Sequence, residues 1–321
     1  MRYIFTVLSI CFLSHLAFAQ QPAQYTTYML DPLRYNPAYA GLDYALSVTG
    51  TFRQQWAGLT GAPRGQRLSA HLPLYFLRGG FGLQLENDAI GAHQLTIARA
   101  DYNYQLEMGS GVLSAGLGVS MQQWTLNGNE LLSPNGIYEG PGSPDHQDNI
   151  LNQATESASG LQFTAGVFYQ TEKLEAGLSV ENLSSTSLQL NQFDYQVLRA
   201  YHAFIRANFE VGNSLLVQPS VWLRTDEIEN QVDLSVLVTY NDNIFGGVSF
   251  RGYDAARQDA LAIIAGFQLA PSIQLAYAYD IALSPLQSVH SGSHEIVVKY
   301  RLDKAIGKGK LPPIIYHPRA K

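Results

Sequence analysis

The sequence predicts an all-β protein, an antiparallel up-and-down transmembrane β-barrel of about fourteen strands that sits in an outer membrane. Three observations predict it. Apolar and polar side chains alternate along long segments, very short connections alternate with longer ones, and charged residues are scarce. Charged residues make up 14% of the 321 residues, against about 25% in a typical soluble domain, and the mean hydropathy is −0.06. A wall with one apolar and one polar face gives such averages.

An export signal is predicted at residues 1–19. A positive charge at Arg2 precedes an apolar stretch, residues 4–16, and a small-x-small site that ends in Ala19, so we expect cleavage after Ala19. The apolar stretch is shorter than the roughly 20 residues of a spanning helix. No run of 18 apolar residues follows it, which excludes a helical membrane protein.

Composition excludes several chemistries in the mature chain. Cys11 is the one cysteine and lies within the signal, so neither a disulfide nor a thiol nucleophile nor a cysteine-bound metal is expected after cleavage. The net charge of −6 and the lack of a basic stripe with interleaved aromatics set nucleic acid aside as a partner.

Period-two alternation dominates the chain from about residue 45 to 302. Residues 112–122 are VLSAGLGVSMQ, in which Leu, Ala, Leu, Val and Met alternate with Ser, Gly, Gly, Ser and Gln. Residues 272–283 alternate in the same way. A shift of one residue there would move Asp280 to the apolar face, so the register is well specified.

The predicted strands are each roughly 9–15 residues long, about twice the length usual in soluble domains and enough to cross a membrane at a tilt. They are 45–56, 64–76, 79–87, 93–108, 111–125, 160–171, 173–183, 197–211, 214–225, 230–241, 244–252, 258–270, 272–284 and 293–302. Aromatic residues that favour a membrane–water interface lie near their ends: Trp56, Tyr75, Phe76, Trp124, Tyr169, Tyr240 and Tyr300.

The connections support the barrel more strongly than the strands do. Every second one is very short: 77–78, 109–110, 172, 212–213, 242–243 and 271. The others are mostly longer: 57–63, 88–92, 126–159, 184–196, 226–229, 253–257 and 285–292. Short periplasmic turns that alternate with longer outside loops are typical of outer-membrane barrels.

We expect charges of both signs on the inward face of the wall. On the lipid face, each charge would cost roughly 2–4 kcal/mol near the midplane. The predicted inward charges are Arg53, Arg67, Arg99, Asp101, Glu175, Glu181, Arg206, Glu210, Arg224, Asp233, Asp280, Glu295, Lys299 and Arg301. This mixture favours a paired lumen wall over an ion-selective pore. A barrel of this size needs something to close it, and residues 20–44 could supply a plug.

Two segments lie outside the predicted barrel, 45–302, and are both expected on the periplasmic side. Residues 20–44 are rich in Tyr and Pro, which suit contact with a protein partner, although the segment could equally plug or cap the barrel. Residues 303–321 form a basic, Pro-rich tail that could meet an acidic partner or peptidoglycan, or simply flank the last strand. The candidate partner-binding residues are Tyr25, Tyr28, Tyr35, Asn36, Pro37, Tyr39, Tyr316, Pro318 and Arg319.

Two small groups of residues are considered as candidates for catalysis or metal binding. Ser293 and His294 adjoin Glu295, but neighbours on one strand face opposite sides, so they cannot form a hydrolase pair by themselves. A lipid hydrolase would need partners from other strands. Residues 145–149 offer oxygen ligands for calcium, yet their spacing fits no known calcium loop. We therefore expect no enzyme activity, no cofactor and no metal.

Several stretches resemble the PorP/SprF family of type IX secretion membrane proteins. They are QYTTYMLDPLRYNPAYAG (24–41), RQQWAGLTGAPRG (53–65), GGFGLQLENDAIG (79–91) and YDIALSPLQSVHSGSHEIVVKYRL (279–302). Their order and spacing carry the resemblance from the first mature residues to the last strand. The final YHPRAK (316–321) matches the Pro-Arg ending of the family only in part.

The resemblance implies an outer-membrane barrel of the gliding and type IX secretion apparatus, with no catalytic motif. Its implied partners are membrane lipid and either a periplasmic lipoprotein ring, a peptidoglycan-binding protein or the C-terminal domain of one secreted adhesin. The leading hypothesis is a platform that binds and anchors such a protein. A passive porin is the alternative, and a lipid hydrolase is the third.

Overall fold

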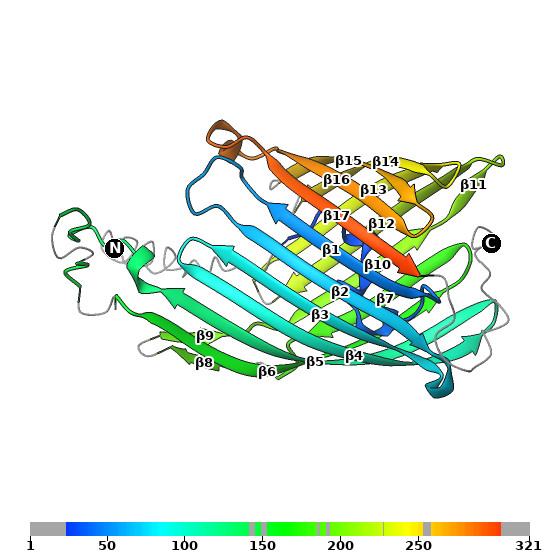
Figure 1. Cartoon of the computed structure of the whole chain (residues 1–321), viewed down its shortest axis with the longest axis horizontal. Coiled ribbons are helices and arrows are strands. Elements are labelled where there is room, and N and C mark those ends of the chain that lie inside the picture. Colours follow the sequence, from blue (N-terminus) through cyan, green and yellow to red (C-terminus); the bar gives the residue numbers. More distant parts are fainter. Residues whose placement is uncertain are drawn as a thin grey trace, which may run out of the picture.

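The computed structural model describes residues 24–140, 145–148, 153–184, 187–190, 193–226, 228–252 and 258–302. Among these residues, fifteen strands pair in one antiparallel sheet that closes on itself (Figure 1). Asn208 alone separates β10 from β11, so these two count as one strand of the wall and the barrel has fourteen. The predicted fold class is confirmed.

The strands of the barrel follow one another around the wall in chain order. They are β1 (Leu46–Gln54), β2 (Arg64–Leu74), β3 (Gly79–Ile90), β4 (His93–Met108), β5 (Gly111–Asn127), β6 (Thr155–Gln170), β7 (Leu174–Glu181), β10 (Ala200–Ala207), β11 (Phe209–Val211), β12 (Leu215–Asp226), β13 (Asn230–Tyr240), β14 (Ile244–Gly252), β15 (Gln258–Ala270), β16 (Ile273–Ala282) and β17 (Ser293–Leu302). The ladder from Leu46–Leu302 to Gln54–His294 joins β1 to β17 and closes the cylinder.

The two ends of the barrel differ, as the connections predict. The short-turn end, at the right of Figure 1, carries connections of two to four residues, including the 3₁₀ turn η4 (Tyr75–Leu77). The long-loop end, at the left, carries the others, including η6 (Pro285–Ser288). Within the described residues, no helix has the length and apolar character needed to cross a membrane.

The wall has an apolar outer face and a polar inner face. On β5, Leu117, Val119 and Met121 are exposed on the outside, whereas Ser114 and Ser120 are buried on the inside. This alternation is the one predicted for residues 112–122. Most of the predicted inward charges are buried in the lumen, but Glu210 lies exposed near the end of its strand at the short-turn end.

Two predicted connections contain structure that the sequence did not indicate. Strands β5 and β6 run on to Asn127 and from Thr155, so the predicted loop 126–159 is shorter than expected. Residues 122–127 and 155–160, at the left of Figure 1, are here named the β5–β6 extension. On one side β4 pairs with residues 122–126, and on the other side β6 runs past the end of its pairing with β7 at Ala165. Within the predicted loop 184–196, β8 (Ser187–Leu190) and β9 (Phe193–Gln196) form a separate hairpin.

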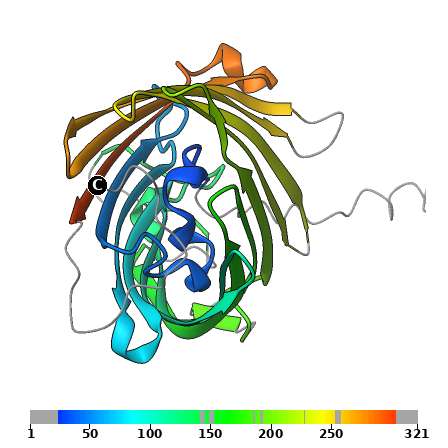
Figure 2. The ribbon, with the colours of Figure 1, turned by 90° about the vertical axis from the view of Figure 1, so that its right-hand side faces the viewer.

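The described part of the N-terminal segment, residues 24–44, lies inside the barrel and is here named the plug. It contains three 3₁₀ turns, η1 (Tyr28–Leu30), η2 (Pro32–Arg34) and η3 (Pro37–Tyr39). Figure 2 shows it in dark blue within the ring of strands. Its side chains are buried almost throughout, so the core of the molecule lies between the plug and the inner wall.

Candidate functional site

The plug runs along the lumen from one end toward the other. At its start, Tyr25 lies against Gly65 near the long-loop end of β2. At its finish, Gly41 lies against Pro73 at the short-turn end. The sequence predicted that this segment lies on the periplasmic side, either as a plug or as a docking segment. The structure corrects the predicted position, because residues 24–44 occupy the lumen.

The local sequence explains why this segment makes short turns rather than a strand or a long helix. Pro32 and Pro37 begin η2 and η3, where a missing N–H costs nothing. The Asn36 side chain accepts a hydrogen bond from the Ala38 N–H at 3.0 Å and caps η3. The plug therefore satisfies part of its own backbone and leaves the rest to the wall.

Glycines in the wall make room for the plug backbone. A Cβ on Gly80 would come within 1.9 Å of the Ala40 carbonyl oxygen, and one on Gly116 within 2.4 Å of the Ala38 nitrogen. These distances are far below van der Waals contact, so the plug lies directly on the inner wall and only glycine permits the approach.

The first polar centre joins the plug to β1, β16 and β17. Buried Arg53 lies between Asp280, at 2.6 Å, and Glu295, at 3.1 Å. The plug adds Thr26, whose N–H donates to Glu295 at 2.8 Å and whose hydroxyl donates to Asp280 at 2.8 Å. The N–H of Thr27 also donates to Glu295, at 3.0 Å. The wall charges are thus paired with one another and with plug donors.

A second centre lies across the lumen, on β3, β4 and β7. Arg34 of the plug pairs with Glu86 at 2.8 Å and with Glu181 at 3.1 Å. Arg99 reaches Glu181 at 3.0 Å and donates to the Leu33 carbonyl at 2.6 Å. Because a buried charge without its partner is costly, this network fixes the middle of the plug to one side of the wall.

Three further ties hold the plug elsewhere. Arg67 pairs with Asp31, whose carboxylate also accepts from the Ser69 hydroxyl at 2.6 Å. Arg206 donates to the Met29 carbonyl at 2.9 Å. At the short-turn end, Asp43 pairs with Lys299 at 2.9 Å. The plug is therefore tied to strands all round the barrel.

Asp43 also accepts a hydrogen bond from the Tyr39 hydroxyl at 2.6 Å. Burial on its own would raise the pKa of the Asp43 carboxyl. The neighbouring Lys299 charge and the Tyr39 hydrogen bond outweigh burial and hold this pKa well below its usual range. Asp43 is therefore ionised at neutral pH and its pairing with Lys299 is intact.

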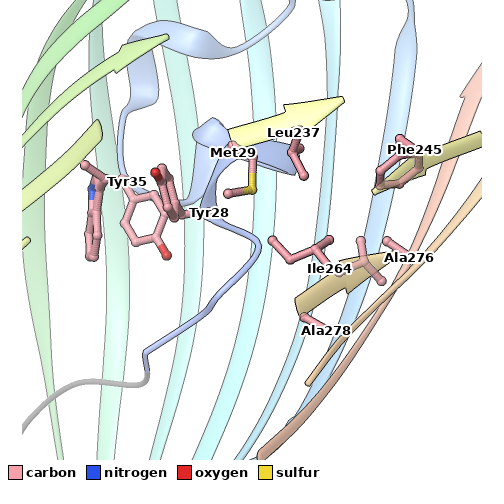
Figure 3. Packing of buried hydrophobic residues seen from close by; sticks show 10 residues of the cluster. Tyr28, Met29, Tyr35, Leu237, Phe245, Ile264, Ala276 and Ala278 are labelled. Carbon is pink, nitrogen blue, oxygen red and sulfur yellow. The ribbon is translucent and has the colours of Figure 1, made fainter. Parts of the chain in front are cut away.

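Apolar contacts complete the seat of the plug. Figure 3 shows Met29 facing Leu237, Phe245 and Ile264 of the wall. Tyr28 stacks on the Trp222 ring with centroids 5.8 Å apart. The wall residues that meet Met29 are apolar although they face inward, which indicates that the plug rather than water is their normal neighbour.

The six predicted partner-binding residues of the N-terminal segment are all in the plug: Tyr25, Tyr28, Tyr35, Asn36, Pro37 and Tyr39. Each is buried in the lumen. Asn36, for example, donates to the Val167 carbonyl at 2.9 Å. The three predicted in the tail, Tyr316, Pro318 and Arg319, lie outside the described residues.

The second feature of interest is the β5–β6 extension with the β8–β9 hairpin. The hairpin lies over the face of the extension that continues the inner wall, where Leu188 covers Gly160 and Tyr195 stacks on Trp124 with centroids 3.9 Å apart. Trp124 therefore packs on this hairpin and is not part of a membrane girdle, which corrects its predicted position.

The two residues considered for hydrolysis, Ser293 and His294, face opposite sides of the wall. Ser293 is buried and its hydroxyl oxygen accepts from the Trp56 N–H at 3.1 Å, whereas His294 faces outward beside Tyr277, with 2.6 Å between the Tyr277 hydroxyl and Nδ1. Among the described residues, no group of three or more His, Cys, Asp or Glu could hold a metal ion. His146 is buried against Tyr138, and Asn149 lies outside the described residues.

Sequence reasoning did not name several charges of the lumen. Glu86 and Arg251 alternate with apolar neighbours on β3 and β14, so the period-two pattern could have found them. Asp31, Arg34 and Asp43 lie in the plug, where no repeat marks which side chains face the wall. Only the positions of the opposite charges in the folded barrel identify their partners.

These observations define a closed outer-membrane β-barrel whose lumen is filled by its own N-terminal segment. The model of the family "Type IX secretion system membrane protein PorP/SprF" matches residues 17–300. The chain belongs to this family.

Solved structures of other proteins are similar to this chain at low sequence identity. The monoaromatic hydrocarbon channel CymD is 12% identical, with a TM-score of 0.51 over 86% of this chain and 94% of that one. The toluene transporter TbuX of Ralstonia pickettii is 11% identical, with a TM-score of 0.49 over 87% and 93%. Omp33 of Acinetobacter baumannii is 9% identical, with a TM-score of 0.46 over 81% and 98%. The likeness to CymD shows the fold alone. A comparison with curated proteins finds no match.

Proposed function

We propose that this barrel is a non-enzymatic platform of the type IX secretion and gliding apparatus. In this proposal the long-loop end faces the outside and holds a secreted surface protein, or another subunit of the machinery, by direct contact. The membership of the family supports a role in type IX secretion. The platform role is our inference from the geometry of the two ends.

The single observation that carries the proposal is the seated plug. A transport pore needs an open path, yet here the N-terminal segment is tied to opposite sides of the wall through Arg53 and Arg34. Breaking one buried pair of this kind costs about 3–5 kcal/mol. A barrel that fills its own lumen so firmly is better suited to presenting its ends than to passing solutes.

The long-loop end supplies a surface for a partner. The β5–β6 extension runs past the end of the pairing with β7 and packs on the β8–β9 hairpin through the stacked Trp124 and Tyr195. Rigid aromatic and uncharged polar surface is typical of protein interfaces. We therefore assign the partner contact to the extension and the β8–β9 hairpin.

Crosslinking in the native envelope tests this function. The full-length chain with a C-terminal affinity tag is crosslinked in intact cells, isolated in detergent and analysed by mass spectrometry. We expect one secreted surface protein or machinery subunit to co-isolate in near-stoichiometric amount. An unrelated tagged barrel from the same cells is the control, and equal recovery with both barrels would contradict the proposal.

A pair of variants locates the contact. Trp124→Ala removes the ring on which the hairpin stacks, and we expect it to lower the recovery of the partner several-fold. Phe163→Ala is the matched control, because Phe163 is an exposed residue on the lipid face of β6. Loss of the partner in both variants would indicate a general effect on the barrel.

A further inference from the structure

We infer that a polar patch on the outer face of β2, β3, β4 and β5 binds the saccharide headgroup of a glycolipid in the outer leaflet of the membrane. The inference depends on the proposed function only through the orientation of the barrel, with the long-loop end outside. The patch, here named the polar ladder, consists of outward side chains near that end: Arg64, Gln66, Asn87, Gln94, Thr96 and Gln123.

The outer face of these four strands changes from apolar to polar at the same row of the sheet. The last apolar row is Leu68, Leu85, Ala98 and Met121, in which each residue is directly opposite the next. The following outward row is Gln66, Asn87, Thr96 and Gln123. A side-chain amide or hydroxyl in hydrocarbon without a hydrogen-bond partner would cost roughly 2–7 kcal/mol. The hydrocarbon therefore ends between these two rows.

The height of the polar rows places them among lipid headgroups. A strand rises about 3.4 Å per residue at a tilt of about 40°, so two residues climb about 5 Å along the membrane normal. The row that contains Gln66 thus lies within a headgroup layer of about 5–7 Å. The next row, with Arg64 and Gln94, lies about 10 Å above the last apolar residues, beyond the reach of a small headgroup. A headgroup of several sugar units reaches both rows.

The uncharged members of the polar ladder suit sugar hydroxyls. The Gln94 side-chain nitrogen donates to the Asn87 side-chain oxygen at 2.6 Å, and the Thr96 hydroxyl donates to the same oxygen at 3.2 Å. These bonds hold the three side chains next to one another. Gln94 and Thr96 are also exposed. Because a sugar hydroxyl both donates and accepts, an array of fixed amides and a hydroxyl can bind several of them at once.

Arg64 gives the polar ladder its charge. It is exposed at the start of β2, on the same outward face as Gln66. Its neighbour across the β2–β3 ladder is Ala89, whose small side chain leaves room for a ligand. A guanidinium pairs with phosphate or carboxylate groups through two parallel hydrogen bonds. Since no member of the polar ladder is acidic, the headgroup that fits is a saccharide with an anionic group.

Continuity with the lipid-facing wall indicates what covers the polar ladder. Leu68 and Leu85 lie directly below it and are exposed to the lipid tails. The groups that stand above these tails are the headgroups of the same lipids. The surface that we assign to a protein partner lies on the other face of the sheet, where Trp124 packs on the β8–β9 hairpin. The two faces therefore serve two different ligands.

Retention of lipopolysaccharide by the purified barrel tests the inference. The full chain is immobilised in detergent, incubated with lipopolysaccharide, washed and assayed for bound sugar, with phosphatidylethanolamine as the phospholipid comparison. We expect the wild-type barrel to retain lipopolysaccharide in preference to the phospholipid. We expect the double variant Asn87→Leu with Thr96→Val to retain at least threefold less. Equal retention by wild type and variant, or none by wild type, would overturn the inference.

The far side of the barrel supplies a matched control. Thr225 of β12 lies opposite Asn230 of β13 near the long-loop end, and its hydroxyl donates to the Asn230 side-chain oxygen, as Thr96 does to Asn87. Thr225→Val with Asn230→Leu removes the same groups, and we expect it to retain as much lipopolysaccharide as wild type. Heat-dependent gel mobility shows that each barrel is folded. An equal loss in both double variants would overturn the inference.

Arg64→Gln tests the charge and leaves the amide and hydroxyl row intact. We expect at least threefold weaker retention at low salt and a smaller difference at high salt, because salt screens exposed charges. Unchanged retention would overturn the assignment of an anionic headgroup. The core saccharide without its acyl chains should compete weakly. Competition as strong as that of intact lipopolysaccharide would assign the site to a soluble sugar and overturn the inference.

The crosslinking experiment separates this inference from the proposed function. We expect the Asn87→Leu with Thr96→Val barrel to recover as much surface protein as wild type. Loss of that protein with normal retention of lipopolysaccharide would assign the polar ladder to the protein partner and overturn the inference. If the wild-type barrel recovers no protein but retains lipopolysaccharide at the polar ladder, the proposed function fails and the glycolipid site stands.

Discussion

The lumen and the β5–β6 extension are built from opposite materials. In the lumen, charges such as Arg53, Arg34 and Glu295 are buried, paired and connected to the plug. On the extension, residues 157–160 are small and uncharged, and Ser157 and Ser159 are exposed. Buried ion pairs are specific in geometry but add little net stability, whereas aromatic and uncharged polar surface suits contact with a protein partner. The comparison teaches that the filled lumen and the proposed binding surface lie in different parts of one barrel.

The largest expected effect comes from removing the plug. Deleting residues 24–42 takes away the partners of both polar centres and the apolar neighbours of Ile264 and Phe245. We expect the wild-type protein to be silent in planar bilayers and the deletion variant to give steady ion conductance, since a wall of this size then encloses water. Heat-dependent gel mobility shows whether the variant barrel still forms.

The channel hypothesis is tested by the same recordings. Steady conductance of the wild-type protein, equal to that of the deletion variant, would mean that the plug does not close the lumen. The contrast between a closed lumen and a binding end would then be lost.

The next effect concerns the first polar centre. Arg53→Met leaves the Asp280 and Glu295 carboxylates buried without their cation, so we expect a loss of about 3–5 kcal/mol in the free energy of unfolding. Denaturant unfolding in lipid vesicles measures it. Arg64→Met is the control, because Arg64 is exposed at the start of β2 and surface changes are usually within about 0.5 kcal/mol. Similar losses in both variants would show that the centre contributes no special stability.

A smaller effect is expected where the plug backbone touches the wall. Gly116→Val places side-chain atoms where the Ala38 nitrogen lies, and such overpacking costs about 1–3 kcal/mol. We expect the plug of this variant to become accessible to protease while the barrel stays folded. Gly50→Val is the matched control, because Gly50 faces outward and its nearest atom is 4.0 Å away. If the plug of Gly116→Val stays protected from protease, the plug backbone does not depend on close contact with the wall at this position.

The sequence was sufficient for the barrel because the lipid imposes a simple rule. Alternation located every strand of the wall, since outward side chains such as Leu117 must be apolar wherever lipid touches them. The rule ends where the membrane ends. On the β5–β6 extension, Ser157 and Ser159 take the outward positions, so the period-two signal vanishes and residues 155–159 were assigned to a loop.

The plug could be proposed from the sequence but not placed by it. Its 3₁₀ turns give no hydrophobic period, and its Tyr and Pro residues suit a protein partner as well as a lumen. The predicted inward charges, such as Arg53 and Glu295, indicated that something polar fills the barrel. Which plug residue meets which charge depends on contacts such as Thr26 with Glu295, which are 269 positions apart and leave no local signal.

The smallest expected effect concerns pH at the short-turn end. The pKa of Asp43 is held well below its usual range, because Lys299 and Tyr39 outweigh its burial. A carboxyl with a depressed pKa in the folded state contributes stability that is complete above its unfolded pKa and is lost as the pH falls through the folded one. The tie between plug and wall should therefore not change between pH 8 and pH 5, since these values lie above the unfolded pKa of about 3.9.

Asp43→Asn tests this tie against the rest of the plug. Removing the charge weakens the bonds from Lys299 and Tyr39, so we expect a loss on the order of 1–3 kcal/mol at neutral pH. The difference from wild type should shrink as the pH falls below about 4, because the Asp43 carboxyl of the unfolded chain then takes up a proton while the folded one stays ionised. Denaturant unfolding at several pH values measures it. A difference that stays constant down to pH 2 would show that the Asp43 charge is not what holds the plug at this end, and that the polar centres around Arg53 and Arg34 hold it without help.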